Sequence, residues 1–173
     1  EIVLESKVGK GSVFHLKLDL PVSSSRQTLM SKKEGGNKYN LMGLRVLMVE
    51  DNHFNRLIGE RFLQKWGALV DHANNGQDGL KRLYLKQYDL VLMDLEMPVM
   101  NGYDAIRAIR DHEDAAINDI SIVALTATVT NKIKSDVLKL GVNDVVSKPF
   151  DPEYLYSVVL ENSPDWIRPA ITA

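Results

Sequence analysis

Short runs of apolar residues alternate along most of this chain with segments in which apolar residues recur at helical spacing. The strand-like runs lie at residues 46–49, 69–73, 90–94, 122–125 and 145–146, and the third of them ends in a carboxylate, Asp94. A typical segment with helical spacing follows the first run and contains Phe54, Leu57, Ile58, Phe62 and Trp66. Apolar runs of this length indicate buried strands, and the 3–4 residue spacing indicates amphipathic helices. The pattern therefore predicts an α/β fold, with five strands and five helices forming a doubly wound parallel sheet covered on both faces.

The first 21 residues follow a different pattern. Phe14, Leu16, Leu18 and Leu20 alternate with polar residues after a glycine-containing turn, and Pro21 ends the run. This period of two predicts a β-hairpin over residues 1–21. An isolated hairpin is marginally stable in water, so we expect it to belong to a larger sheet. Its unpaired apolar strand is expected to seek another sheet edge or a second chain, which would give a dimer.

Composition sets the remaining boundaries. Residues 22–43 are rich in Ser, Lys and Gly and predict a linker, residues 44–162 form the predicted α/β domain, and residues 163–173 lack periodicity and predict a loose tail. The formal net charge of -2 argues against nucleic-acid binding, and no run approaches the length of a membrane span. The chain has no cysteine, which excludes disulfides and thiolate chemistry. It begins at Glu1, within strand-like sequence, and is interpreted as part of a longer protein.

Polar residues end four of the five predicted strands. Glu50 and Asp51 follow the first strand, Asp94 the third, Thr126 the fourth and Lys148 the fifth. The carboxyl ends of parallel strands meet at one edge of the sheet, where α/β proteins bind ligands. Three carboxylates at one edge repel one another unless a cation lies among them, and Mg²⁺ is the hard cation that such oxygens suit. Lys148 and Thr126 would supply a positive charge and a hydroxyl to a phosphoryl group.

Each of these residues also has an ordinary structural explanation. Glu50 and Asp51 could cap the following helix, Thr126 could be a β-branched strand end, and Lys148 could be a solvated loop lysine. Asp94 alone fits a helix cap or loop tip. The coincidence of all of them at successive strand ends favours a common site.

Residues 44 to about 161 resemble the receiver domain of two-component response regulators. Four motifs carry the resemblance: Val49-Glu50-Asp51-Asn52, the stretch from Met93 to Gly102, Ala124-Leu125-Thr126-Ala127 and Ser147-Lys148-Pro149-Phe150. The resemblance implies a flavodoxin-like strand order of 2-1-3-4-5 and a cis peptide between Lys148 and Pro149. It implies that Asp94 accepts a phosphoryl group from phosphohistidine, and that Thr126 and Lys148 contact that group. It further implies that Glu50, Asp51, Asp94 and the backbone carbonyl of Glu96 hold Mg²⁺.

This sequence departs from the receiver pattern at the position three residues before Lys148. That position is often Tyr or Phe in the family and is Val145 here, so the usual inward swing of an aromatic ring is not expected. Glu96 and Thr128, each two positions beyond a motif residue, are expected to flank the path of water to an acyl phosphate.

The hairpin carries a second resemblance. The stretch Ser6-Lys7-Val8-Gly9-Lys10-Gly11-Ser12-Val13-Phe14 is similar to the closing hairpin of the ATP-binding domain of sensor histidine kinases. Hairpin, linker and receiver in this order resemble the carboxyl-terminal part of a hybrid histidine kinase, which is itself membrane-anchored in some cases. The expected partners are a histidine kinase and a histidine phosphotransfer protein, in the cytoplasm and without direct membrane contact. The chain lacks the kinase catalytic motifs, so its own enzymatic role is limited to its phosphorylation and dephosphorylation.

Two other functions are considered. A pseudo-receiver would bind partners without phosphorylation, and the complete set of Asp94, Glu50, Asp51, Thr126 and Lys148 argues against it. A phosphatase with Asp94 as nucleophile would need a separate general acid, which the loop after Asp94 does not offer.

Overall fold

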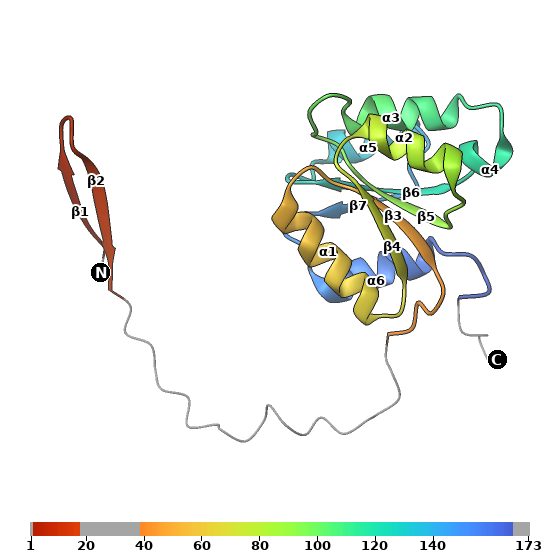
Figure 1. The fold of residues 1–173 in the computed structure, drawn as a ribbon, viewed down its shortest axis with the longest axis horizontal. Coiled ribbons are helices and arrows are strands. Elements are labelled where there is room, and N and C mark those ends of the chain that lie inside the picture. The colour runs from red at the N-terminus through yellow and green to blue at the C-terminus, as the bar shows by residue number, and fades with distance from the viewer. Residues whose placement is uncertain (1, 18–38, 168–173) are drawn as a thin grey trace, which may run out of the picture. The chain divides into compact units, whose positions relative to one another are not determined.

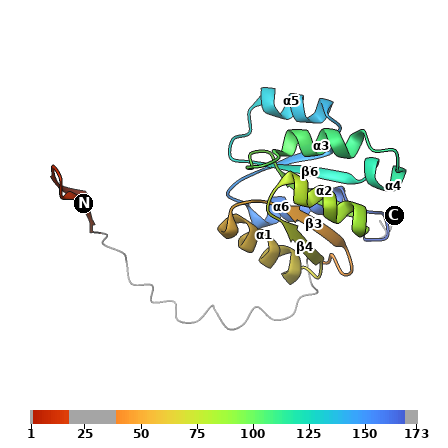
Figure 2. The same ribbon diagram turned by 45° about the horizontal axis from the view of Figure 1, so that its top comes forward.

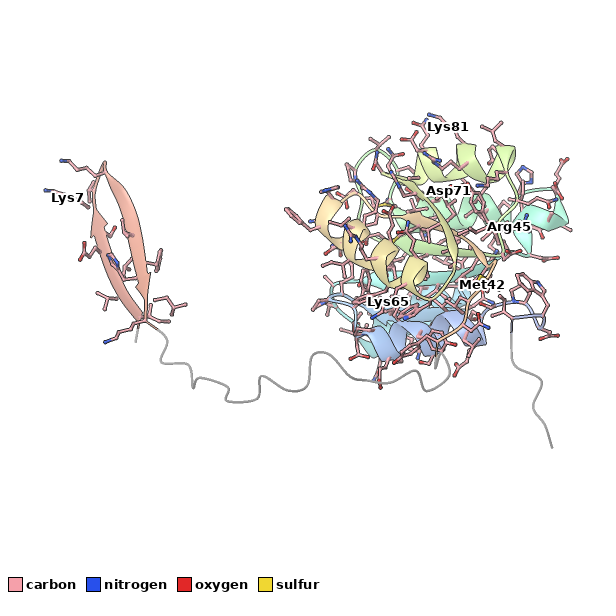
Figure 3. The ribbon with its side chains drawn as sticks, turned by 60° about the horizontal axis from the view of Figure 1, so that its bottom comes forward. Lys7, Met42, Arg45, Lys65, Asp71 and Lys81 are labelled. Atoms are coloured by element: carbon pink, nitrogen blue, oxygen red, sulfur yellow. The ribbon has the colours of Figure 1, made fainter. Side chains whose placement is uncertain are left out.

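The computed structural model describes residues 2–17 and 39–167, in two compact units that divide between residues 37 and 38. The first unit is an antiparallel hairpin of β1 (Ile2–Lys7) and β2 (Gly11–Leu16), with Ile2 opposite Leu16 and Lys7 opposite Gly11. Figure 1 shows the hairpin, and Figure 3 labels Lys7 at its turn. The predicted continuation through Leu18, Leu20 and Pro21, and residues 22–38 of the predicted linker, lie outside the described residues.

The hairpin has an apolar face that no core covers within the described residues 2–17. The cross-strand pairs Ile2–Leu16 and Leu4–Phe14 lie on the same side, because side chains alternate along each strand. Ile2, Leu4, Phe14 and Leu16 are all at least half exposed. That the hairpin belongs to a larger sheet stays a prediction.

The second unit contains the predicted parallel sheet. Its strands are β3 (Arg45–Val49), β4 (Leu69–Ala73), β5 (Leu90–Asp94), β6 (Ser121–Thr126) and β7 (Asp144–Ser147). All neighbouring pairs are parallel, in the spatial order β4-β3-β5-β6-β7. Counted within this domain, the order is 2-1-3-4-5, and the predicted fold class is confirmed.

Helices cover both faces of the sheet (Figures 1 and 2). One face carries α1 (His53–Lys65) and α6 (Pro152–Glu161), and the other carries α2 (Gly76–Leu85), α3 (Gly102–Arg110) and α5 (Asn131–Lys139). A sixth helix, α4 (Ala115–Asn118), was not predicted. It is too short for an apolar period, and its order rests on the Asp114 cap and buried Ile117. Within the described residues no helix has both the length and the apolar composition needed to cross a bilayer.

The apolar runs of β3 and β5 are buried because successive side chains enter two different cores. Leu47 and Val49 of β3 pack toward α2 and α3, whereas Val46 and Met48 pack toward α1 and α6. All four side chains are fully buried. Burial on both faces is the physical reason that these strands read as continuous apolar segments.

The apolar face predicted for helix α1 is wrong over its first two turns. Phe54 is 73% exposed, and Leu57 and Ile58 are also exposed. The helix packs through Gly59 and Leu63, and the predicted Phe62 and Trp66 at its carboxyl-terminal end also contact the core. At Gly59 a Cβ atom would lie only 2.6 Å from Met48 Cε, so glycine lets α1 approach the sheet closely. The apolar residues of the first two turns are therefore left on the surface.

The domain also extends beyond its predicted boundaries. Leu41, assigned to the linker, is fully buried, and its backbone N–H donates to the Trp66 carbonyl at 2.7 Å. Ser163, assigned to the loose tail, is buried, and its Oγ donates to the Val159 carbonyl at 2.6 Å. Ile167 also packs against the core on that side. Single anchoring residues of this kind carry no periodicity, and residues 168–173 lie outside the described range.

Candidate functional site

Three carboxylates meet where β3 and β5 end. Glu50 follows β3, Asp51 comes next, and Asp94 is the last residue of β5. One carboxylate oxygen from each lies within 4.8 Å of the others. Glu50 and Asp94 are buried, at 0% and 1% exposure, whereas Asp51 is exposed. The predicted acidic cluster is thus brought together, with one carboxylate open to solvent and two beneath it.

Lys148 joins the two buried carboxylates. Its Nζ lies 2.6 Å from Asp94 Oδ2 and 3.1 Å from Glu50 Oε2. The lysine follows β7, and its peptide bond to Pro149 is cis. Lys148 is therefore not the solvated loop lysine of the ordinary explanation, because its side chain is only 13% exposed.

Charge and burial oppose one another in this cluster. Burial, and then the charge of Asp94, raise the pKa of Glu50 above its usual value, and Lys148 offsets part of the rise. Burial alone would lower the pKa of Lys148, but hydrogen bonds and charge attraction from Asp94 and Glu50 outweigh it and raise that pKa. The lysine thus stays protonated and serves as the shared cation of the two buried carboxylates.

Thr126 reaches the same edge at the end of β6 and is buried. Its Oγ1 donates to the Thr128 carbonyl at 3.0 Å and accepts from the Thr128 backbone N–H at 3.2 Å. Among the described residues, the hydroxyl is thus bonded to its own loop. Thr128 itself is exposed. Val145 is buried in the core on the α2 and α3 side, so no ring at this position is available to swing.

The loop after Asp94 is held tightly. The Glu96 backbone N–H donates to Asp94 Oδ1 at 3.2 Å, while the Glu96 side chain is exposed. Val99 has a φ of 69°, a conformation unusual for a β-branched residue. The Gly102 N–H donates to the Leu95 carbonyl at 3.0 Å. The chain therefore folds back against the end of β5, where Asp94 lies.

Gly102→Ala is expected to destabilise the domain by about 3 kcal/mol or more, because a Cβ at this position would lie 2.1 Å from the Asp94 carbonyl oxygen. The loop would have to move away from the site. Urea denaturation measures the change. Gly79→Ala in α2 is the matched control, since its Cβ would lie 3.1 Å from Val49 Cγ2 and the helix gains about 1 kcal/mol of propensity. Equal stability of the two variants would contradict the close approach at Gly102.

Three residues near Glu50 were not recognised in the sequence. The Asn52 backbone N–H and the Asn55 amide donate to Glu50 Oε1 at 3.3 and 3.2 Å. Arg56 donates to the Glu50 backbone carbonyl at 3.0 Å. The available signal was a pair of asparagines three residues apart at the start of a helix, which by itself indicates only capping.

The donor set fits the cation that the sequence predicts. Carboxylate oxygens converge from Glu50, Asp51 and Asp94, and one of them is exposed to incoming solvent or ligand. Mg²⁺ prefers one or two carboxylates together with water and phosphate oxygens. The acidic residues present are therefore compatible with Mg²⁺.

Fold, cluster and loop geometry together define a receiver domain. The family model for the response regulator receiver domain matches residues 46–160, and the chain belongs to this family. Its sheet and helices have the arrangement of the chemotaxis-type receiver, and relatives of this chain include receiver domains of hybrid histidine kinases.

Particular relatives refine this assignment. The autoinducer 2 sensor kinase/phosphatase LuxQ of Vibrio vulnificus is 32% identical over 160 residues, 92% of this chain and 18% of LuxQ. This chain therefore spans less than a fifth of that relative. The receiver domain of sensor histidine kinase PA1611 from Pseudomonas aeruginosa, solved with magnesium in its active-site cleft, is 32% identical with a TM-score of 0.64, over 69% of this chain and 97% of that one. The Saccharomyces cerevisiae Ssk1 receiver domain, solved with the histidine phosphotransfer protein Ypd1, is 30% identical with a TM-score of 0.67, over 75% of this chain and 95% of that one.

Proposed function

We propose that this receiver accepts a phosphoryl group from phosphohistidine on Asp94 and relays it to a histidine phosphotransfer protein. The observation that carries the proposal is Lys148, held 2.6 Å from Asp94 Oδ2 in a cluster of three carboxylates. Three neighbouring carboxylates repel one another and repel an incoming phosphoryl group. Here a fixed cation offsets that repulsion.

The transfer is an in-line displacement at phosphorus. A carboxylate oxygen of Asp94 attacks, the bond from phosphorus to the imidazole nitrogen breaks, and the nitrogen keeps the electron pair. Lys148 binds the phosphoryl oxygens as negative charge builds up on them, and Thr126 donates its hydroxyl after leaving Thr128. Glu50, Asp51, Asp94 and the Glu96 carbonyl are the residues that would hold Mg²⁺, which supplies further charge neutralisation when bound. Transfer to the partner's histidine is the same displacement in reverse.

The test uses acetyl phosphate as a small donor. With Mg²⁺ present, the intact chain should gain the mass of one phosphoryl group, in a form that acid and hydroxylamine release. No gain under these conditions would favour a pseudo-receiver that binds partners without phosphorylation. Rapid hydrolysis of a phosphate ester such as p-nitrophenyl phosphate would instead favour a phosphatase.

The surface of α1 supports a histidine phosphotransfer protein as the partner. This helix begins three residues after Glu50, so partner atoms on it would lie close to the site. Phe54, Leu57 and Ile58 are exposed there, and such an apolar patch beside a reactive group favours a protein partner. The related Ssk1 receiver has been solved in complex with Ypd1, which shows that receivers of this fold form such complexes.

Phe54→Ala is expected to slow phosphoryl transfer from phosphorylated Ypd1 at least tenfold, since truncating an apolar anchor at an interface costs more than about 1 kcal/mol. Labelling by acetyl phosphate should not change, because Phe54 has no contact with Asp94. Rapid-quench assays with each donor measure both rates. Tyr154→Ala, an exposed aromatic on α6, is the control. Equal slowing with both donors would show that Phe54 acts on the site and not on docking.

We also propose that the chain is a cytoplasmic part of a hybrid histidine kinase, with residues 1–21 from the ATP-binding domain, 22–43 as linker and 44–162 as receiver. The exposed apolar face of the hairpin and the likeness to LuxQ over 92% of the chain support this organisation.

The exposed apolar face of the hairpin predicts that this chain self-associates. Exposed pairs such as Leu4 and Phe14 are expected to drive dimer formation at high micromolar concentration. Light scattering should detect a dimer that Phe14→Ser abolishes, while Phe54→Ser, on the other unit, does not. A monomer at all concentrations would contradict the prediction.

A further inference from the structure

We infer that Asn55 is a positioning residue for Glu50, and that it sets the affinity of the acidic site for Mg²⁺. This inference rests on the proposed function and deepens it. Asn55 Nδ2 donates to Glu50 Oε1 at 3.2 Å, and the Asn52 backbone N–H donates to the same oxygen at 3.3 Å. The other oxygen, Oε2, contacts Lys148 at 3.1 Å. Both carboxylate oxygens of this fully buried residue are thus partnered.

The arrangement at the start of α1 differs from an ordinary capping box. Asn52 is the N-cap, and its side chain accepts from the Phe54 and Asn55 backbone N–H groups. In a capping box, the side chain three residues after the N-cap returns to the backbone N–H of the N-cap. Here Glu50 Oε1 takes that N–H, and the side chain of Asn55 turns to Glu50 instead. Asn55 is therefore released from capping and acts on the acidic cluster.

The identity of the residue fits this role. The usual capping-box residue is Glu or Gln, and a glutamate at position 55 would add a fourth carboxylate beside Glu50, Asp51 and Asp94. An amide donates a hydrogen bond without adding charge. The first turn of α1 contains no acidic residue, although acidic side chains are favourable at that position in other helices.

Fixing Glu50 matters because its carboxylate is repelled by Asp94. Removing the Asn55 amide leaves Glu50 Oε1 with a single hydrogen-bond donor, the Asn52 backbone N–H, in a fully buried environment. The Glu50 side chain would then turn toward Lys148 or adopt another rotamer. Either change would move an oxygen away from the cation site. Partners that orient a metal-ligating carboxylate typically contribute 10–100-fold to metal affinity.

The experiment compares Mg²⁺ affinity, by isothermal titration calorimetry, for wild type, Asn55→Ala, Asn55→Gln and Asn75→Ala in the full chain. Asn75 is the N-cap of α2, and its side-chain hydrogen bonds are with Asp78. Asn75→Ala therefore removes a helix-start asparagine that does not bond Glu50. We expect Asn55→Ala to weaken Mg²⁺ binding at least tenfold. Asn55→Gln keeps the amide and should restore most of the affinity, and Asn75→Ala should bind as wild type does. At saturating Mg²⁺, labelling of Asn55→Ala by acetyl phosphate should return to within threefold of wild type.

The outcomes separate the role of Asn55 in Mg²⁺ binding from the proposed phosphoryl transfer to Asp94. Wild-type affinity in Asn55→Ala, or equal weakening in Asn75→Ala, would overturn the role of Asn55, as would a wild-type chain that binds no Mg²⁺. If the chain binds Mg²⁺ but takes no phosphoryl group, the proposed function fails. The affinities of the four proteins then still decide the role of Asn55.

Discussion

Asp94→Asn is expected to abolish formation of acid-labile phosphate from acetyl phosphate and Mg²⁺. The amide oxygen of asparagine is a poor nucleophile, and the variant cannot form an acyl phosphate. Asparagine has the size of aspartate, and its amide oxygen can still accept the hydrogen bond that Lys148 donates to Asp94 Oδ2 at 2.6 Å. The loss should therefore appear in intact-mass and acid-lability assays while circular dichroism still shows the folded domain.

The matched control for this variant is Asp104→Asn. Asp104 lies in the first turn of α3, is exposed, and pairs with Arg107 at 2.9 Å. Asp104 is a carboxylate of the same domain that does not belong to the acidic cluster. The Asp104→Asn variant should therefore be labelled like wild type. Residual acid-labile phosphate in Asp94→Asn would place the acceptor on another carboxylate, with Asp51 the first to examine.

Lys148→Met should have the second-largest effect, on stability as well as on transfer. Removing the lysine leaves Glu50 and Asp94 buried without their shared cation, and breaking such a pair costs about 3–5 kcal/mol. The rate of labelling should fall about 100-fold or more, as for other lost donors that stabilise transition-state charge. Urea denaturation at pH 7 and single-turnover labelling measure the two effects.

The pH dependence of the Lys148→Met variant gives a sharper test. Burial and Asp94 already hold the pKa of Glu50 above its usual 4.5, and losing Lys148 removes a contact that lowers it. Because the folded-state pKa is above the unfolded one, protonation of Glu50 favours the folded state, so destabilisation should shrink as pH falls from 7 toward 4.5. The double variant Glu50→Gln/Lys148→Met should recover much of the stability at pH 7 but not the labelling. If the double variant is as unstable as Lys148→Met, buried charge is not the cause.

Much of the fold was predictable because strand and helix periodicity are local. Residues 46–49 and 90–93 are apolar without interruption because both faces of the sheet are covered, and this pattern was enough to predict the parallel five-stranded fold. The site was predictable for a related reason. Asp94 and Thr126 end a strand, and Glu50, Asp51 and Lys148 directly follow one. Parallel topology brings these carboxyl ends to one edge. Their individual chemical roles remain predictions.

The tertiary structure alone decided which polar groups touch. Lys148 and Glu50 are 98 positions apart, and only packing of β7 and β3 in one sheet with β5 and β6 between them brings their side chains within 3.1 Å. The exposure of Phe54 could not be predicted, because helical spacing does not say which part of an apolar face the sheet covers when Gly59 makes the close contact. The sequence by itself thus determined the elements and the edge where the charged residues gather. That Asn55 donates to Glu50 could not be predicted, because the direction of the Asn55 side chain relative to Glu50 is fixed only when α1 packs on the sheet.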